Sequence, residues 1–443
     1  MAHIKLSAFV FMVVTVTIAS AQFDISDLPS GPYCGAQVVG CCHGRLDRCS
    51  APILGTLCYC DDFCDRTVNG DCCPDFWPVC KGNYTVQELR VCHFKGQYYA
   101  YGKTTKENCN ICKCEQVGQK AEMLCERNPC IVEENIINAV NQQSEHYHWS
   151  AANYSEFWGR RLDEGLKLRL GTLQPHRFVR KMSPVRRIYD PRTLPAQFDA
   201  KEKWPTYLSP IQDQGWCGAS WAISTAAVAS DRYAIVSKGL EKIHLSAQNL
   251  LSCNDRGQQS CSGGYLDKAW LFLRKYGLVD EHCYPYVGHD ENCRIPKRSN
   301  LLTARCNLPL NVRRKEKYKV GPAYRLANET DIMYEIMASG SVQATMKVYH
   351  DFFTYRSGIY KHTELSPSDR TGYHSVRILG WGEENDYYGR VQKYWKVANS
   401  WGEEWGERGY FRIARGTDEC EIESFVLGAW PFMVDPVSKN DVY

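Results

Sequence analysis

The sequence predicts a protein of the α+β class, in which small disulfide-rich modules precede one larger globular domain. The division follows from the 23 cysteines, of which 16 lie between Cys34 and Cys130 and 7 between Cys217 and Cys420. The composition, with 44% hydrophobic and 23% charged residues, is that of a globular protein. The motifs that follow Leu194 supply the α+β assignment of the larger domain. A length of 443 residues is compatible with about two to four domains.

Residues 1–21 have the pattern of a secretory signal peptide. Lys5 belongs to a short basic start, an apolar run extends from Leu6 to Ile18, and small residues end at Ala21. A membrane anchor is the alternative, but the run is shorter than the roughly 20 residues that a spanning helix needs. We therefore expect cleavage after Ala21, secretion, and no transmembrane segment. The net charge of +3 gives no reason to expect nucleic acid as a partner.

Residues 30–82 are expected to form a disulfide knot. Ten cysteines fall in the 47 residues from Cys34 to Cys80, where apolar residues are too few for a core, so cross-links must supply the stability. Such a density behind a signal peptide indicates disulfides rather than metal thiolates. The string CYCDDFCDRTVNGDCCPDFWPVC resembles the second half of a somatomedin-B module, which implies an extracellular adhesion or protein-binding domain. An arbitrary disulfide-rich spacer is the alternative.

Residues 88–131 contain six more cysteines, and their order resembles a half-length von Willebrand factor type C module. A zinc site is the competing interpretation of the C-x-x-C-x-C group formed by Cys109, Cys112 and Cys114. An oxidising compartment favours disulfides over zinc. Six cysteines permit fifteen connectivities, and the sequence does not choose among them.

Residues 132–192 have an amphipathic helical pattern, with apolar positions such as Ile136, Val140, Phe157 and Leu162 at helical spacing. The strings ENIINAVNQQ, YSEFWGRRL and LGTLQP resemble the propeptide of cathepsin B, which implies a segment that runs backwards through the substrate cleft. Its basic residues could bind acidic glycosaminoglycans, although a solvated linker face is the more usual meaning. They are Arg160, Arg161, Lys167, Arg169, Arg177, Arg180, Lys181, Arg186 and Arg187.

Residues 193–435 resemble a papain-like peptidase of the cathepsin B type. The ordered motifs include DQGWCGASWA, SAQNLLSC, CSGGY, HSVRILGWG and YWKVANSWGEEWGERGYFRI. The resemblance implies a two-lobed α+β fold, with a helical lobe and a β-barrel-like lobe. It also implies three disulfides that leave Cys420 unpaired, namely Cys217–Cys261, Cys253–Cys293 and Cys283–Cys306. Within this domain the run VRRKEKYKV at 312–320 predicts an edge strand and a second candidate site for heparan sulfate.

The catalytic positions of this resemblance are filled except for the nucleophile. A papain-like enzyme uses a thiolate near a histidine, together with donors that hold the oxyanion. The oxyanion glutamine corresponds to Gln214, the histidine to His374 and its orienting asparagine to Asn399, with Trp401 covering the pair. The nucleophile position holds Ser220, whose hydroxyl is far less acidic than a thiol with its pKa of about 8.5.

We therefore expect these positions to be vestigial, without cofactor or metal. Serine proteases polarise their histidine with a buried carboxylate, and neutral Asn399 does not supply one. The alternative is a weak serine-nucleophile peptidase of papain fold.

The order of the modules resembles the tubulointerstitial nephritis antigen family. That resemblance implies a secreted, non-proteolytic matrix protein that binds laminin, collagen IV, integrins or secreted Wnt-type ligands. N-glycosylation sequons at Asn83, Asn153 and Asn328 agree with secretion.

Overall fold

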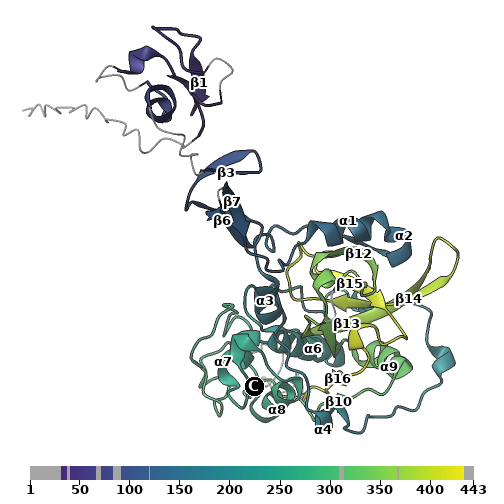
Figure 1. The fold of residues 1–443 in the computed structure, drawn as a ribbon. Coiled ribbons are helices and arrows are strands. Elements are labelled where there is room, and N and C mark those ends of the chain that lie inside the picture. Colours follow the sequence, from purple (N-terminus) through teal and green to yellow (C-terminus); the bar gives the residue numbers. More distant parts are fainter. Residues whose placement is uncertain are drawn as a thin grey trace, which may run out of the picture. The chain divides into compact units, whose positions relative to one another are not determined.

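The computed structural model describes residues 31–36, 40–65, 71–82, 91–118, 120–308, 314–366 and 369–433. They fall into two compact units (Figure 1). The first unit comprises the described residues up to 107 together with 111–126, and the second comprises 108–110 and the residues from 127 onwards. The signal peptide expected at 1–21 and the sequon at Asn83 lie outside the described residues.

The disulfide knot of the first unit has a core built largely from its own cysteines, with Ala51, Ile53 and Phe76 beside them. Strands β1 (Ser50–Ile53) and β2 (Thr56–Tyr59) form a hairpin, followed by the short helices η2 (Asp62–Asp65) and η3 (Trp77–Lys81). The ten cysteines pair among themselves, as the even count predicts. The pairs are Cys34–Cys60, Cys41–Cys80, Cys42–Cys49, Cys58–Cys73 and Cys64–Cys72.

The second cysteine group also pairs within itself, through Cys92–Cys114, Cys109–Cys130 and Cys112–Cys125. All three cysteines of the candidate zinc group are thus in disulfides, and none offers a thiolate to a metal. The strands of this region form a β3–β4 hairpin and a three-stranded β5–β6–β7 sheet, and the β3–β4 and β6–β7 pairs are antiparallel. They are β3 (Val91–Phe94), β4 (Gln97–Ala100), β5 (Thr104–Glu107), β6 (Asn110–Val117) and β7 (Lys120–Cys125).

The second unit contains a nine-stranded sheet in the order β10-β16-β11-β13-β14-β15-β12-β8, with β9 added to β13. Only the β12–β15 pair is parallel among the pairings described. The strands are β8 (Trp149–Ala151), β9 (Phe198–Asp199), β10 (Tyr324–Arg325), β11 (Val342–Val348), β12 (Tyr355–Tyr360), β13 (Gly372–Asn385), β14 (Val391–Ala398), β15 (Tyr410–Ala414) and β16 (Val426–Gly428). Strand β11 and residues 374–382 of β13 are almost continuously buried because both of their faces are covered.

Helix α6 (Ser220–Val236) is the central helix of this unit, and 14 of its 17 residues are buried. A helix that is buried on nearly all sides must pack on more than one neighbour, and α6 contacts α7, α8 and β13. The other helices of the body are α5 (Ala200–Lys203), α7 (Ala247–Cys253), α8 (Leu266–Tyr276) and α9 (Glu329–Ser339). None of the described helices is long and apolar enough to cross a membrane.

The propeptide-like segment is part of this unit rather than an appendage. Strand β8 pairs with β12, and Ile136, Val140, Phe157 and Leu162 are buried in the same core as the sheet. The predicted helical pattern is realised as short helices, because loops and β8 interrupt it. They are α1 (Glu134–Gln142), α2 (Ser144–Tyr147), α3 (Leu162–Gly165), η4 (Leu166–Leu170) and α4 (Arg177–Arg180).

The edge strand predicted at 312–320 is wrong for the described part of that run, since residues 314–320 have only isolated bridges at Tyr318 and Val320. Two of its cations are buried. Arg314 pairs with Glu241, and Lys317 donates to two backbone carbonyls, with its pKa lowered to about 8 by burial. The run therefore presents less positive charge to solvent than its sequence indicates.

Candidate functional site

Residues Gly171, Thr172 and Leu173 bridge two parts of the body at the place where the resemblance implies a substrate cleft. Thr172 N–H donates to the Tyr373 carbonyl at 3.1 Å, and Leu173 N–H donates to the Gly264 carbonyl at 2.9 Å. Gly171 has a φ of +100°, and a Cβ atom on it would lie 2.0 Å from the Gly218 carbonyl oxygen. Only glycine tolerates both the backbone angle and this close approach. The propeptide-like segment therefore lies against the residues that lead into helix α6.

Ser220, the first residue of α6, is completely buried beneath this segment. Its Oγ lies 3.0 Å from Oγ1 of Thr172, and the N–H of Ser375 donates to it at 3.4 Å. His374 is not among the hydrogen-bond partners of this hydroxyl in the described part of the chain. The nucleophile position is thus engaged with the segment that covers it rather than with the histidine beside it.

His374 on β13 lies where the resemblance predicts, but its electrostatic state is unfavourable for catalysis. Its Nε2 lies 2.7 Å from Oδ1 of Asn399, so the N–H at that nitrogen donates to the amide oxygen. The opposite nitrogen, Nδ1, is buried without a hydrogen-bond partner among the described residues. Burial lowers the pKa of His374 to about 4. The imidazole is therefore neutral at pH 7, and Trp401 covers it with ring centroids 5.3 Å apart.

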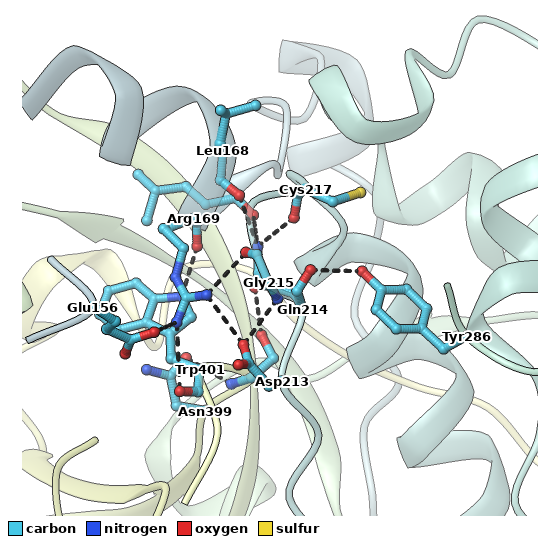
Figure 2. A network of polar contacts seen from close by, with 12 residues as sticks. Glu156, Leu168, Arg169, Asp213, Gln214, Gly215, Cys217, Tyr286, Asn399 and Trp401 are labelled. Carbon is cyan, nitrogen blue, oxygen red and sulfur yellow. Dashed lines mark hydrogen bonds and ion pairs between the residues drawn. The ribbon is translucent and has the colours of Figure 1, made fainter. Parts of the chain in front are cut away.

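Gln214, the predicted oxyanion donor, has its amide group fully engaged. Its Nε2 donates to the carbonyl oxygen of Cys217 at 2.8 Å (Figure 2). The same Nε2 donates to the Leu170 carbonyl at 3.2 Å, while Oε1 accepts from Ser400 Oγ at 2.7 Å. Leu170 belongs to the propeptide-like segment. The segment thus places a carbonyl oxygen at the donor that would hold a substrate's oxyanion.

Arg169 anchors the segment, and its burial was not foreseen from the sequence, which grouped it with the solvated cations. The side chain is 1% exposed. Its Nη1 donates to Asp213 Oδ1 and to the Gly215 carbonyl, and its Nη2 donates to Glu156 Oε2 and to the Trp401 carbonyl, at 2.9–3.4 Å (Figure 2). In return, Trp401 Nε1 donates to the Arg169 carbonyl at 2.6 Å.

The surroundings of Arg169 are otherwise aromatic. Its guanidinium lies 5.2 Å from the ring centroid of Phe157 and 5.6 Å from that of Trp216. Burial raises the pKa of Glu156, and the neighbouring Arg169 opposes that rise. The one signal in the sequence is the position of this arginine in the apolar string LKLRLG, where a cation needs a partner if the string is buried.

Comparison with known proteins places these features in a family. Residues 194–430 match the family model described as papain family cysteine protease. The tubulointerstitial nephritis antigen-like protein of Homo sapiens is 47% identical over 420 residues, covering 90% of this chain and 88% of the relative. This chain belongs to the tubulointerstitial nephritis antigen family. The tubulointerstitial nephritis antigen of Homo sapiens is 42% identical over 426 residues, covering 90% of this chain and 87% of the relative.

Among solved structures, procathepsin B S9 from Trypanosoma congolense is similar to this tubulointerstitial nephritis antigen family member. The TM-score is 0.58 at 32% identity, and the match covers 68% of this chain and 99% of the procathepsin. The fold is therefore papain-like, with mixed helix and sheet.

The predicted cysteines and glycosylation sites complete the comparison between the sequence and the structure of this tubulointerstitial nephritis antigen family member. The three disulfides implied by the resemblance are present, namely Cys217–Cys261, Cys253–Cys293 and Cys283–Cys306. Cys420 is a buried free thiol whose pKa burial raises well above its usual range. Asn153 is exposed, and Asn328 is exposed at the N-cap of α9, where its side chain accepts the Asp331 N–H. Both of these sequons therefore leave room for a glycan.

Proposed function

We propose that this protein is a secreted, non-proteolytic matrix or adhesion protein that uses its papain-like domain as a binding scaffold. The observation that carries the proposal is the contact between Ser220 Oγ and Thr172 Oγ1 at 3.0 Å. While Thr172 covers this buried hydroxyl, a substrate carbonyl has no access to it.

The chemistry of the neighbouring groups supports the same conclusion. General-base catalysis is most effective when the pKa of the base lies near the working pH, and the pKa of His374 is about 4. The donors of Gln214 are occupied by carbonyl oxygens of Cys217 and Leu170. Removing a protease's nucleophile alone costs about six orders of magnitude in kcat in subtilisin. No contact of Ser220 in the described structure favours the alternative of a weak serine-nucleophile peptidase.

Features of the N-terminal modules support the adhesive part of the proposal. Their eight disulfides, like the three in the papain-like domain, fit an oxidising compartment such as the extracellular space. The knot exposes the Trp77 side chain by 57%, and tryptophan is enriched among the side chains that dominate protein–protein contacts. By resemblance, we propose laminin, collagen IV and integrins as partners, with heparan sulfate and Wnt-type ligands as further candidates.

We also propose that residues 132–192 stay in the mature protein. Their burial in the core of the body and the contact of Arg169 with Asp213 support this, because separating the segment would expose apolar surface and leave Asp213 without its cation. Intact-mass measurement of the secreted protein tests the idea. A dominant species that begins near Leu194 would contradict it.

The test of the scaffold proposal compares the wild type with Ser220→Ala. Both are offered dibasic and aromatic peptide substrates, and both are measured for binding to immobilised laminin and collagen IV. We expect no hydrolysis by either protein, and equal binding by the two. Hydrolysis by the wild type that disappears in Ser220→Ala would establish the peptidase alternative. Absence of binding to either matrix protein, by material that is correctly folded, would remove those two partners.

A further inference from the structure

The hairpin between β13 and β14 ends in a tight, ordered turn that extends from the sheet (Figure 1). The Asp386 N–H donates to the Arg390 carbonyl and the Gly389 N–H donates to the Asp386 carbonyl, both at 2.9 Å. Gly389 takes a positive φ of 76°, which completes a three-residue loop of the common hairpin type. The Asp386 carboxylate accepts the N–H groups of Tyr388 and Arg390, so it stabilises the turn. The turn therefore holds the two residues at its tip in a defined, outward position.

These two residues are tyrosines with no role in the core. Tyr387 is 77% exposed and Tyr388 is 68% exposed. Neither hydroxyl has a hydrogen-bond partner among the described residues, whereas tyrosine hydroxyls in packed positions usually do. The Arg390 guanidinium lies 5.1 Å from the ring centroid of Tyr388 and covers one of its faces. Tyr387 is thus the more accessible phenol of the pair.

Acidic residues precede the tip, two at the end of strand β13 and one just after it. Glu383, Glu384 and Asp386 stand four, three and one residues before Tyr387. The carboxylates of Glu383 and Glu384 pair with Arg415 and Arg412, yet these glutamate side chains remain 34% and 44% exposed. The side chain of Asp386, in contrast, is 0% exposed and pairs with Arg390, so the exposed acidic flank consists of Glu383 and Glu384. The basic residues of a tyrosine sulfotransferase in the secretory pathway bind an acidic flank of this kind beside an exposed tyrosine.

We propose that Tyr387 is a site of O-sulfation, with Tyr388 as a lesser acceptor because Arg390 covers it. The proposal rests on the secretion proposed above. In the reaction, the phenolic oxygen of Tyr387 attacks the sulfur of an adenylyl-sulfate donor. The bond from that sulfur to the donor's phosphate oxygen breaks, and its electron pair leaves with the phosphate. The phenolic proton passes to a base of the sulfotransferase, so no group is oxidised or reduced.

A sulfate ester at this position adds a permanent negative charge beside carboxylates that are already exposed. Arginine-rich protein surfaces bind such oxyanions through charge-assisted hydrogen bonds. Because Tyr387 has no packing role, the fold does not oppose the change. The hairpin tip thereby becomes an acidic docking feature for a basic partner.

The test uses the full chain, expressed in animal cells that are fed radiolabelled sulfate and stripped of N-glycans after secretion. Variants Tyr387→Phe, Tyr388→Phe and the double variant are compared with Tyr101→Phe. Tyr101 is 52% exposed but is followed by Lys103 and Lys106 instead of being preceded by acids, so it serves as the matched control. We expect label on the wild type and the control, loss of most of it in Tyr387→Phe, and loss of all of it in the double variant.

Peptide mass measurement gives the second readout, with one SO3 group on the tip peptide that phosphatase does not remove. Glu384→Gln should lower its occupancy while leaving both tyrosines in place. Secreted, N-glycosylated protein with an unmodified tip peptide would overturn the sulfation proposal and leave the secreted function standing. Retention inside the cell without N-glycans would instead contradict secretion, and the sulfation proposal would fail with it.

Discussion

Replacing Arg169 with methionine tests whether a buried charge locks the propeptide-like segment in the cleft. Methionine keeps the apolar length of the side chain but removes the guanidinium and the four hydrogen bonds that it donates. The carboxylates of Glu156 and Asp213 lose their cation, and the carbonyl of Gly215 loses its donor.

The expected cost follows from the exposure of the partners. Breaking a buried ion pair typically costs about 3–5 kcal/mol, because the remaining charge is left uncompensated. Here Glu156 is 31% exposed and Asp213 is 51% exposed, so water compensates part of the loss. We therefore expect the lower end, about 3 kcal/mol. At roughly 2–4 °C per kcal/mol, the thermal midpoint of the second unit should fall by about 6–12 °C.

The defect should also depend on pH. Burial already raises the folded-state pKa of Glu156, and the loss of Arg169 raises it further. A folded carboxyl with a raised pKa holds its proton more tightly than the unfolded chain does, so the fold gains stability as the pH falls through that pKa. The cost of Arg169→Met should therefore be smaller in mild acid than at pH 7.

Calorimetry and limited proteolysis of residues 166–174 measure these effects on the full chain. The control is Arg161→Met in the same segment, where Arg161 is 46% exposed and pairs with Asp163, which is 68% exposed. An exposed pair of this kind contributes at most about 1 kcal/mol. If Arg169→Met loses no more stability than this control and stays equally resistant to protease, the buried anchor is not what holds the segment.

Three further predictions concern the site and its scaffold. In the folded full chain the new thiol of Ser220→Cys should resist a thiol-alkylating probe, because Thr172 covers the position, and it should react once the chain unfolds. Rapid labelling of the folded protein would show that the position is open to solvent. In the folded wild type the pKa of His374 is lowered from 6.5 to about 4. As the pH drops from 6.5 to about 4, the unfolded state therefore binds a proton at His374 before the folded state does. The free energy of unfolding should fall over this pH range by up to about 3 kcal/mol. His374→Gln should flatten this acid limb, and an unchanged limb in denaturant titrations would refute the assignment. Asn328→Ala removes both a sequon and the N-cap of α9, whereas Thr330→Ala removes the sequon but keeps the capping side chain. When deglycosylated variants are compared, Asn328→Ala should lower the free energy of unfolding by about 1 kcal/mol more than Thr330→Ala. Equal free energies of unfolding would exclude a stabilising cap.

The sequence by itself predicted the papain-like fold, the division of the chain and the site positions, and of these predictions the fold is confirmed. These properties depend on residue types at fixed spacings, such as Gln214, Ser220, His374 and Asn399 within ordered motifs. The even number of cysteines in the knot likewise predicted that it closes on itself. The pairing within the knot was not predictable, because many connectivities satisfy the same spacing and only spatial proximity selects among them.

Only the tertiary structure decided what the site residues do. The hydroxyl of Ser220 contacts Thr172, which lies 48 residues earlier in the chain. Arg169 resembled a solvated cation in the sequence, but the fold buries it against Asp213 and the Trp401 carbonyl, which are 44 and 232 residues away. Local periodicity carries no information about such partners, because hydrogen bonds and ion pairs form between groups that the folded chain brings together from distant positions. The sequence predicted that Ser220 stands where the resemblance expects a thiol, and in the folded chain Thr172 covers this residue.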